Sequence, residues 1–238
     1  MKKILTFIIL VLGINGASAQ PWFDIGIKGG IGTSFMYNKQ IFDEQQITHK
    51  FKLGNTYGAK LGFNFVQEHQ ITFDIMQTSY TQGFTYTNAG TEANRQYNLK
   101  GLDLLLMYRT NRKGTYFEIG PQWTTVSSVK YTDDGGYFLT PYTFEQVINK
   151  KNFGIALGFG GYAFGTDNFG VTTGLRINYI LSDLINDRGK QVNFPILQPN
   201  EESDPTHNLG VMFIVEMNYD FGYLVSSRCG KRTKLFVF

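Results

Sequence analysis

A long stretch of alternating side chains near the end of the chain limits the folds that this sequence can adopt. From Asn208 to Tyr223, NLGVMFIVEMNYDFGY, every odd-numbered residue is large and apolar, and most even-numbered residues are small or polar. A period of two over this length predicts a β-strand with two unlike faces. The stretch exceeds the usual globular strand of about five or six residues and is long enough to cross a bilayer, which takes roughly 9–11 tilted residues.

The same alternation recurs along the chain, so we predict an all-β fold: an eight-stranded antiparallel up-and-down transmembrane β-barrel. Outer-membrane barrels have an even number of strands, short periplasmic turns and long external loops. The connections here alternate in that way, and we expect external loops at 38–54, 87–96, 128–151 and 185–206. The other seven predicted strands are Phe23–Tyr37, Asn55–Val66, His69–Tyr86, Tyr97–Arg109, Gly114–Ser127, Asn152–Phe164 and Phe169–Leu184.

Two strands depart from simple alternation. In His69–Tyr86 the apolar residues move from odd positions, such as Phe73, to even positions, such as Phe84. A shift of phase within one strand is typical of a β-bulge, which we place near Met76–Ser79. In Tyr97–Arg109 the apolar Leu105 and Met107 fall on the polar face and blur the pattern.

The first residues have the features of an export signal. Lys2 and Lys3 precede a short apolar run, and Ala17-Ser18-Ala19 forms a small-residue cleavage site before Gln20. We therefore expect a signal peptide at 1–19, a barrel at 20–223 and a basic periplasmic tail at 224–238. Removing Lys2 and Lys3 leaves 20 basic and 19 acidic residues, a balance that does not call for a nucleic-acid partner. Cys229 is the only cysteine, so we expect a free thiol.

The composition of the two strand faces predicts which face meets lipid. The minority face is largely Gly, Asn, Ser and Thr with single charges, and an eight-stranded barrel has an interior just wide enough for side chains. We therefore place the apolar face toward lipid and expect the inward charges to pair, since buried charges must be compensated. The predicted lumen charge network comprises Lys28, Lys60, Asp74, Asp103, Glu118, Arg176 and Glu216. Aromatic residues near strand ends predict interfacial girdles: Trp22, Tyr37, Tyr57, Tyr108, Trp123, Tyr179 and Tyr223.

Two other classes of protein remain as alternatives. A soluble lipocalin-like carrier of an apolar ligand also alternates, but with its apolar face inward. A lipid A-modifying barrel enzyme would use a His beside a Ser, and His49, His69 and His207 show no such partner at a readable spacing. We expect no enzyme activity, no catalytic or metal site and no cofactor.

The chain resembles the PorT-like family of small outer-membrane barrels. The resemblance rests on the cleavage site before Gln20, the opening FDIGIKGGIG, and the paired strands NLKGLDLLLMYR and GTYFEIGPQW. It implies an outer-membrane barrel and covers nearly the whole mature chain. The sequence departs from the family pattern at Asp103, where a proline is common, and in the tail that follows Tyr223.

From these features we expect a cell outer-membrane location and a plugged lumen. The external loops would then act in adhesion, partner docking, envelope support or a secretion-linked role. The expected partners are outer-membrane lipid, the barrel-assembly machinery and an envelope protein, with no nucleic acid.

Overall fold

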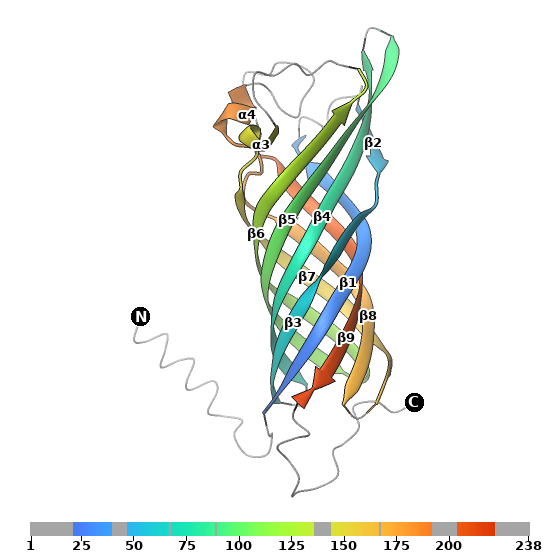
Figure 1. The fold of residues 1–238 in the computed structure, drawn as a ribbon, viewed down its shortest axis with the longest axis vertical. Helices are drawn as coiled ribbons and strands as arrows, with labels where there is room; N and C mark the ends of the chain where they lie inside the picture. The colour runs from blue at the N-terminus through green and yellow to red at the C-terminus, as the bar shows by residue number, and fades with distance from the viewer. Residues whose placement is uncertain are drawn as a thin grey trace, which may run out of the picture.

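The protein folds into a long closed barrel (Figure 1). The structure, a computed structural model, describes residues 21–39, 47–66, 68–88, 90–135, 144–166, 168–191 and 204–221. The predicted signal peptide, the tail after Tyr223 and Cys229 lie outside these residues. Within them, no helix has the length and apolar character needed to cross a membrane.

The elements follow one another as an up-and-down meander. The strands are β1 Trp22–Tyr37, β2 Ile47–Phe51, β3 Gly54–Val66, β4 His69–Asn88, β5 Thr91–Arg112, β6 Thr115–Asp133, β7 Lys151–Gly165, β8 Phe169–Ile180 and β9 His207–Asp220. Two short helices, α3 Phe144–Val147 and α4 Asp187–Gln191, lie in the connections at one end (Figure 1).

Eight antiparallel strands form the ring, as predicted. The first and last strands close it, because β1 pairs with β9 from Asp24↔Asp220 to Tyr37↔His207. Closure removes the unpaired strand edges that hydrocarbon does not tolerate. At the end where β1 begins, the turns are short. Lys113 and Gly114, for example, both have positive φ between the paired Arg112 and Thr115, as a two-residue primed hairpin turn requires.

The ninth strand, β2, lies inside the segment that we predicted as loop 38–54. It pairs with the distal part of β4, from Ile47↔Tyr86 to Phe51↔Gln82, directly beyond the pairing of β3 with β4. Only Lys52 and Leu53 separate β2 from β3, so the two strands follow one another along the same edge of β4 with a short break between them.

The predicted external loop 87–96 is wrong. β4 and β5 pair without interruption up to Asn88↔Thr91, so this connection is a long hairpin rather than a loop. The predicted loop 128–151 is shortened in the same way, because β6 continues to Asp133. The β4–β5 hairpin and β6 therefore remain paired beyond the part of the barrel where apolar and polar residues alternate, which the sequence pattern alone did not indicate.

The predicted bulge at Met76–Ser79 is also wrong. β4 keeps continuous register with β3 and β5 through these residues, and its even-numbered side chains stay buried from Gln70 to Tyr86. The apolar residues change face because the interior changes chemistry: it is charged beside Asp74 and apolar beside Phe84. Leu105 and Met107 also point inward, but beside the charged part of the interior, where they form a small separate apolar cluster with Met76 and Ala156.

Candidate functional site

The lumen contains a cluster of eight ionic side chains, four basic and four acidic. We call this the charge cluster. All eight are buried, with exposed fractions of 3% or less, and they come from seven different strands of the ring. Each member has at least one oppositely charged partner within 3.1 Å. The members are Asp24, Lys28, Lys60, Asp74, Arg109, Glu118, Arg176 and Glu216.

Glu216 is the centre of the cluster because it contacts three cations. Its carboxylate lies 3.1 Å from Lys28 Nζ, 2.9 Å from Lys60 Nζ and 2.6 Å from Arg109 Nη2. Asn218 Nδ2 donates a further hydrogen bond of 2.6 Å to Glu216 Oε1. The other carboxylates link the remaining cations, so that the charges form one connected network rather than separate pairs.

A second set of contacts extends the network toward the opposite wall. Arg176 Nη2 lies 2.9 Å from Asp74 Oδ2 and 2.5 Å from Glu118 Oε1. Glu118 also accepts hydrogen bonds from Arg109 Nε and Nη2, at 3.0 and 2.7 Å. The Arg109 guanidinium stacks over the Tyr116 ring, 4.4 Å from its centroid. Guanidinium groups suit such sites because each can donate to two carboxylates in fixed directions.

The structure brings together six of the seven residues that we predicted for the lumen, and it adds two. Arg109 and Asp24 lie on the polar faces of their predicted strands, yet they were not included in the predicted network. A charge balance would have found Arg109, because the predicted set held three cations against four carboxylates. Asp103 is buried but lies apart from the cluster, where it accepts hydrogen bonds from Tyr80 and Thr124 at 2.8 and 2.6 Å.

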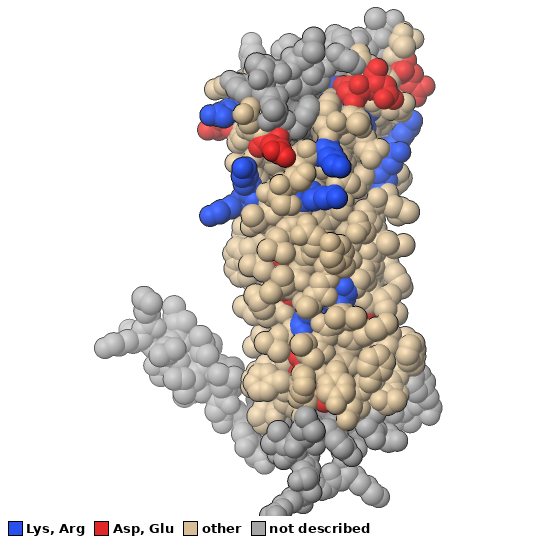
Figure 2. Space-filling view, in the orientation of Figure 1, with Lys and Arg blue, Asp and Glu red and all other residues tan. Residues whose placement is uncertain are grey.

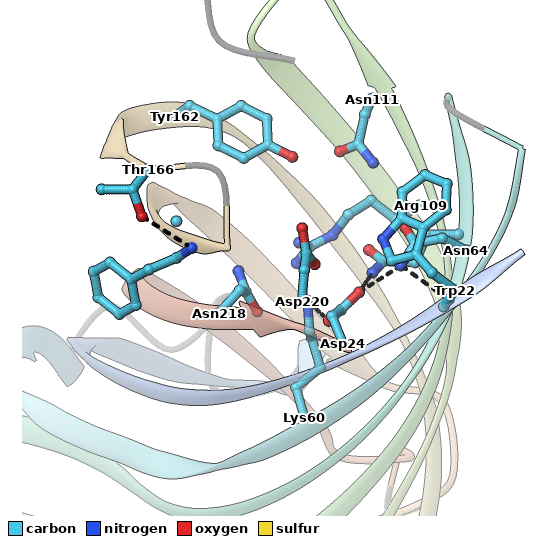
Figure 3. Close-up of a pocket in the computed structure, with 13 residues that line it drawn as sticks. Trp22, Asp24, Lys60, Asn64, Arg109, Asn111, Tyr162, Thr166, Asn218 and Asp220 are labelled. Carbon is cyan, nitrogen blue, oxygen red and sulfur yellow. Dashed lines mark hydrogen bonds and ion pairs between the residues drawn. The ribbon is translucent and has the colours of Figure 1, made fainter. Parts of the chain in front are cut away.

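A polar cavity of about 60 Å³ opens between the charge cluster and the end of the barrel where β1 begins (Figure 3). Asp24, Lys60 and Arg109 contribute to its lining, together with Asn111 and Tyr162. In Figure 3 the Tyr162 hydroxyl and the Asn111 amide point toward one another across this space. A cavity of this size and polarity suits one or two water molecules. The charge cluster therefore borders a small polar cavity, which we call the vestibule.

Beyond the charge cluster, the lumen contains a cluster of apolar side chains, which we call the apolar plug, with buried polar residues such as Gln82 and Asn208 among them. Val147, Ile148, Leu184 and Ile185 reach into it from the connections, and a bridge between Ile148 and Ile185 joins these two segments. These four residues lie at or directly after the end of α3, or shortly before α4, at the end of the barrel that carries the two helices (Figure 1). The plug comprises Met36, Tyr80, Phe84, Tyr97, Leu99, Val126, Val147, Ile148, Leu184, Ile185, Met212 and Ile214.

The long β4–β5 hairpin and β6 are fastened together by one acidic residue, Asp133. Tyr86, Tyr131 and Arg95 each donate a hydrogen bond to its carboxylate, at 2.6, 2.7 and 2.9 Å. The Arg95 guanidinium lies over the rings of Tyr86 and Tyr131. Burial alone would raise the pKa of Asp133, but these hydrogen bonds hold that pKa below its usual range. Burial and the bond to Asp133 raise the pKa of Tyr86 to about 12. We call this group the rim clamp.

The outer surface carries a wide belt of large apolar side chains. Phe213 of β9 is 46% exposed on this surface, whereas Glu216 of the same strand, which belongs to the charge cluster, is 2% exposed. Figure 2 shows that the middle of the barrel is almost free of charged side chains on the face in view. This arrangement does not favour the lipocalin-like alternative, which requires the apolar face to point inward.

The predicted interfacial aromatics fall near the two ends of this belt. Trp22 and Tyr108 lie toward the end with short turns, and Tyr37, Tyr57, Trp123 and Tyr179 lie toward the other end. Tyr223 lies outside the described residues. The expected role of these residues as membrane girdles stays a prediction.

The histidines lie outside any recognisable catalytic arrangement among the described residues. His49 Nδ1 shares a hydrogen bond of 3.0 Å with Gln82, and His69 Nδ1 shares one of 2.7 Å with the Tyr108 hydroxyl. His207 packs against the Tyr179 ring. In the same part of the chain, no group of three or more His, Cys, Asp or Glu side chains is placed to hold a metal ion.

Comparisons with known proteins return solved barrels only. No family model and no curated protein matches the chain, so the resemblance to the PorT-like family stays a prediction. Neisserial surface protein A (NspA) matches with 10% identity and a TM-score of 0.40, over 86% of this chain and all of that one. OprG from Pseudomonas aeruginosa matches with 12% identity and a TM-score of 0.38, over 87% of this chain and 98% of that one. Likeness at this level carries no functional argument.

The geometry of the chain itself gives the location. A closed antiparallel ring of eight strands, an apolar outer belt, a polar lumen and short turns at the end with both strand termini are the features of an outer-membrane barrel. The protein is an outer-membrane β-barrel. Because the long connections of such barrels are external, we expect the end with β2, α3 and α4 to be its extracellular end.

Proposed function

We propose that this protein is a non-enzymatic barrel with a closed lumen, and that it acts through its extracellular end in adhesion or in docking an envelope partner. Envelope support and a secretion-linked role are forms of the same activity, since each requires a partner at this end. The observation that supports the proposal is that the charge cluster and the apolar plug are both buried, at successive levels of the lumen.

The charge cluster and the apolar plug oppose passage of solutes by different means. A solute that enters the vestibule meets the charge cluster, whose eight groups are already paired with one another. Displacing one partner leaves a buried charge uncompensated, which costs about 3–5 kcal/mol. A hydrated solute that passed this level would then have to enter the apolar plug and lose its water. The described lumen is therefore suited to holding the barrel together rather than to conduction.

The extracellular end offers a structured surface instead. The β4–β5 hairpin continues to Asn88 and Thr91, and the rim clamp fixes it against β6. On the outward face of β5 the side chains here are polar, including Glu92 and Asn94. A projecting, rigid and polar hairpin costs little conformational entropy when it binds a partner.

Liposome swelling tests the closed lumen. Vesicles containing the purified protein should swell in small sugars no faster than protein-free vesicles, and planar bilayers should show no porin-like conductance. The matched comparison is a variant with the plug residues Leu99 and Met212 both changed to Gly, which should raise permeability if these residues close the lumen. Porin-sized conductance of the unmodified protein would refute the proposal.

Attachment of expressing cells tests the extracellular role. The double variant Arg95→Ala/Asp133→Ala loosens the rim clamp without touching the charge cluster. We expect it to reduce attachment to envelope preparations or to neighbouring cells, while heat-modifiable gel mobility shows that the barrel still folds. Unchanged attachment in a folded variant with a loosened hairpin would remove this end from the proposed function.

A further inference from the structure

Four lysines gather on one side of the barrel, above the apolar belt. We call them the lysine patch: Lys100 on β5, Lys130 on β6, and Lys150 and Lys151 at the start of β7. All four are exposed. The three strands are neighbours in the ring. Lys151 pairs with Thr125 of β6, the Val126 N–H donates a hydrogen bond of 2.7 Å to the Lys150 carbonyl, and Lys100 pairs with Ser128.

The position of the patch along the strands gives its depth relative to the membrane. On β5 the outward residue before the lysine level is Leu102, and on β7 it is Phe153, which contacts Trp123 of β6 with ring centroids 5.9 Å apart. Lys100 and Lys151 are each two residues beyond these apolar side chains. Two residues rise about 7 Å along a strand, or about 5 Å along the membrane normal at the usual tilt of about 40°. The headgroup layer is about 5–8 Å thick on each side.

The charges of the patch are available to a ligand. None of the four lysines forms an ion pair with any residue that the structure describes. Lys150 also lines an open pocket that contains one further cation, Arg188, and one carboxylate, Glu145. The charged residues that line this pocket are therefore two cations and one carboxylate, a positive balance. Figure 2 shows Lys and Arg side chains gathered in a band between the tan belt and the extracellular tip, where acidic side chains also appear.

We propose that the lysine patch binds the phosphate groups of an anionic lipid in the outer leaflet. The ligand class is a phosphorylated glycolipid headgroup, because this is a surface of exposed cations at headgroup depth beside an aromatic pair that fits the upper edge of the hydrocarbon. Each lysine near an anionic membrane surface contributes favourably, and a spread of four charges suits a headgroup with more than one phosphate. The four lysines of the patch lie on β5, β6 and β7, so the lipid that they hold would lie against this face of the barrel.

Binding of diphosphorylated lipid A in non-ionic detergent tests the proposal, with its fully dephosphorylated form as the second probe. We expect the unmodified full-length protein to bind the phosphorylated form at least tenfold more tightly and to lose affinity as salt rises. The double variant Lys100→Gln/Lys151→Gln should weaken binding at least tenfold. The matched control, Arg112→Gln/Lys113→Gln at the opposite end, removes the same charge from exposed residues and should leave binding within about threefold.

The quadruple variant with all four patch lysines changed to Arg keeps the charge and should bind as the unmodified protein does. Heat-modifiable mobility confirms that each variant is folded before binding is measured. Three results would overturn the proposal: equal binding of dephosphorylated lipid A, equal weakening by the control pair, or displacement by millimolar inorganic phosphate, since the last would show a site for free phosphate rather than for a membrane lipid. The swelling and attachment tests do not depend on this outcome.

Discussion

Replacing Glu216 by Gln would test whether the charge cluster acts as one connected unit. The substitution keeps the shape of the side chain and its hydrogen-bonding oxygen but removes the charge that Lys28, Lys60 and Arg109 share. The cluster would change from four cations and four carboxylates to four against three. Removing one partner of a buried ion pair costs about 3–5 kcal/mol, and we expect the upper part of this range because three cations lose their shared partner. The expected loss appears in the free energy of unfolding.

Urea unfolding of the refolded protein in detergent or lipid vesicles, followed by Trp fluorescence, measures this loss. A second variant restores the balance: Glu216→Gln/Lys28→Met removes one charge of each sign. Lys28 also lies 2.6 Å from Asp74, which keeps Arg176 as its partner. We expect the double variant to lose at least about 1 kcal/mol less free energy of unfolding than the two single variants lose together, because contacting residues in one network usually couple.

Additivity of the two substitutions within about 0.5 kcal/mol would refute the connected cluster, because that is the range expected for independent sites. A loss below about 1 kcal/mol for Glu216→Gln alone would refute burial of the charge, since exposed pairs contribute this little. The control is Asp103→Asn, which removes a lumen carboxylate with no cation partner among the described residues and should leave the Lys28–Glu216 coupling unchanged.

Three further predictions concern other parts of the barrel. Gly158→Ala should lower the free energy of unfolding by about 1–3 kcal/mol, because its Cβ would lie 2.6 Å from Glu118 Cγ. Gly29→Ala, whose Cβ meets nothing within 4 Å, should be tolerated. Equal losses for the two variants in urea unfolding would mean that the lumen is loosely packed. Phe213→Arg should cost about 2–4 kcal/mol by the same measurement, as for a cation on the lipid face, whereas Thr132→Arg above the belt should not; equal costs would contradict the placement of the belt. The rim clamp should be stable above the ordinary Asp pKa of about 3.9 and should loosen as pH falls through the lower pKa of folded Asp133, because a group with a depressed pKa stabilises only while it is ionised. Hydrogen exchange of the hairpin, corrected for its intrinsic pH dependence, measures this, and Asp133→Asn should remove the pH response.

The strands that cross the hydrocarbon could be predicted from sequence because one simple condition governs them. Their outward residues must be apolar and their inward residues must be small or paired, so alternation alone gave the ring of eight, and it placed Lys28 and Glu216 in the lumen. The condition fails where the barrel leaves the membrane. There the outside meets water and the inside holds the apolar plug, so a fixed rule for the two faces led to a false bulge in β4 and a false loop at 87–96.

The plug and the ninth strand could not be predicted for a different reason. Val147 and Ile185 lie in connections without periodicity, and only the closed ring shows that they share one interior. β2 is a segment of five residues within a polar connection, and its pairing depends on the length of β4 rather than on its own pattern. Both features depend on contacts between residues that are far apart in sequence, and local periodicity does not report such contacts.

The length of β4 beyond the apolar belt determines how far the protein reaches from the membrane. The outward side chains of β4 change from the apolar, exposed Ile75 to the polar Thr81 and Thr85, and from Tyr80 the strand continues for eight more residues to Asn88. The last eight steps amount to about 26 Å along the strand, or about 20 Å of height at a tilt of about 40°. The tip of the hairpin therefore lies beyond the headgroup layer, where a partner can contact it without approaching the bilayer.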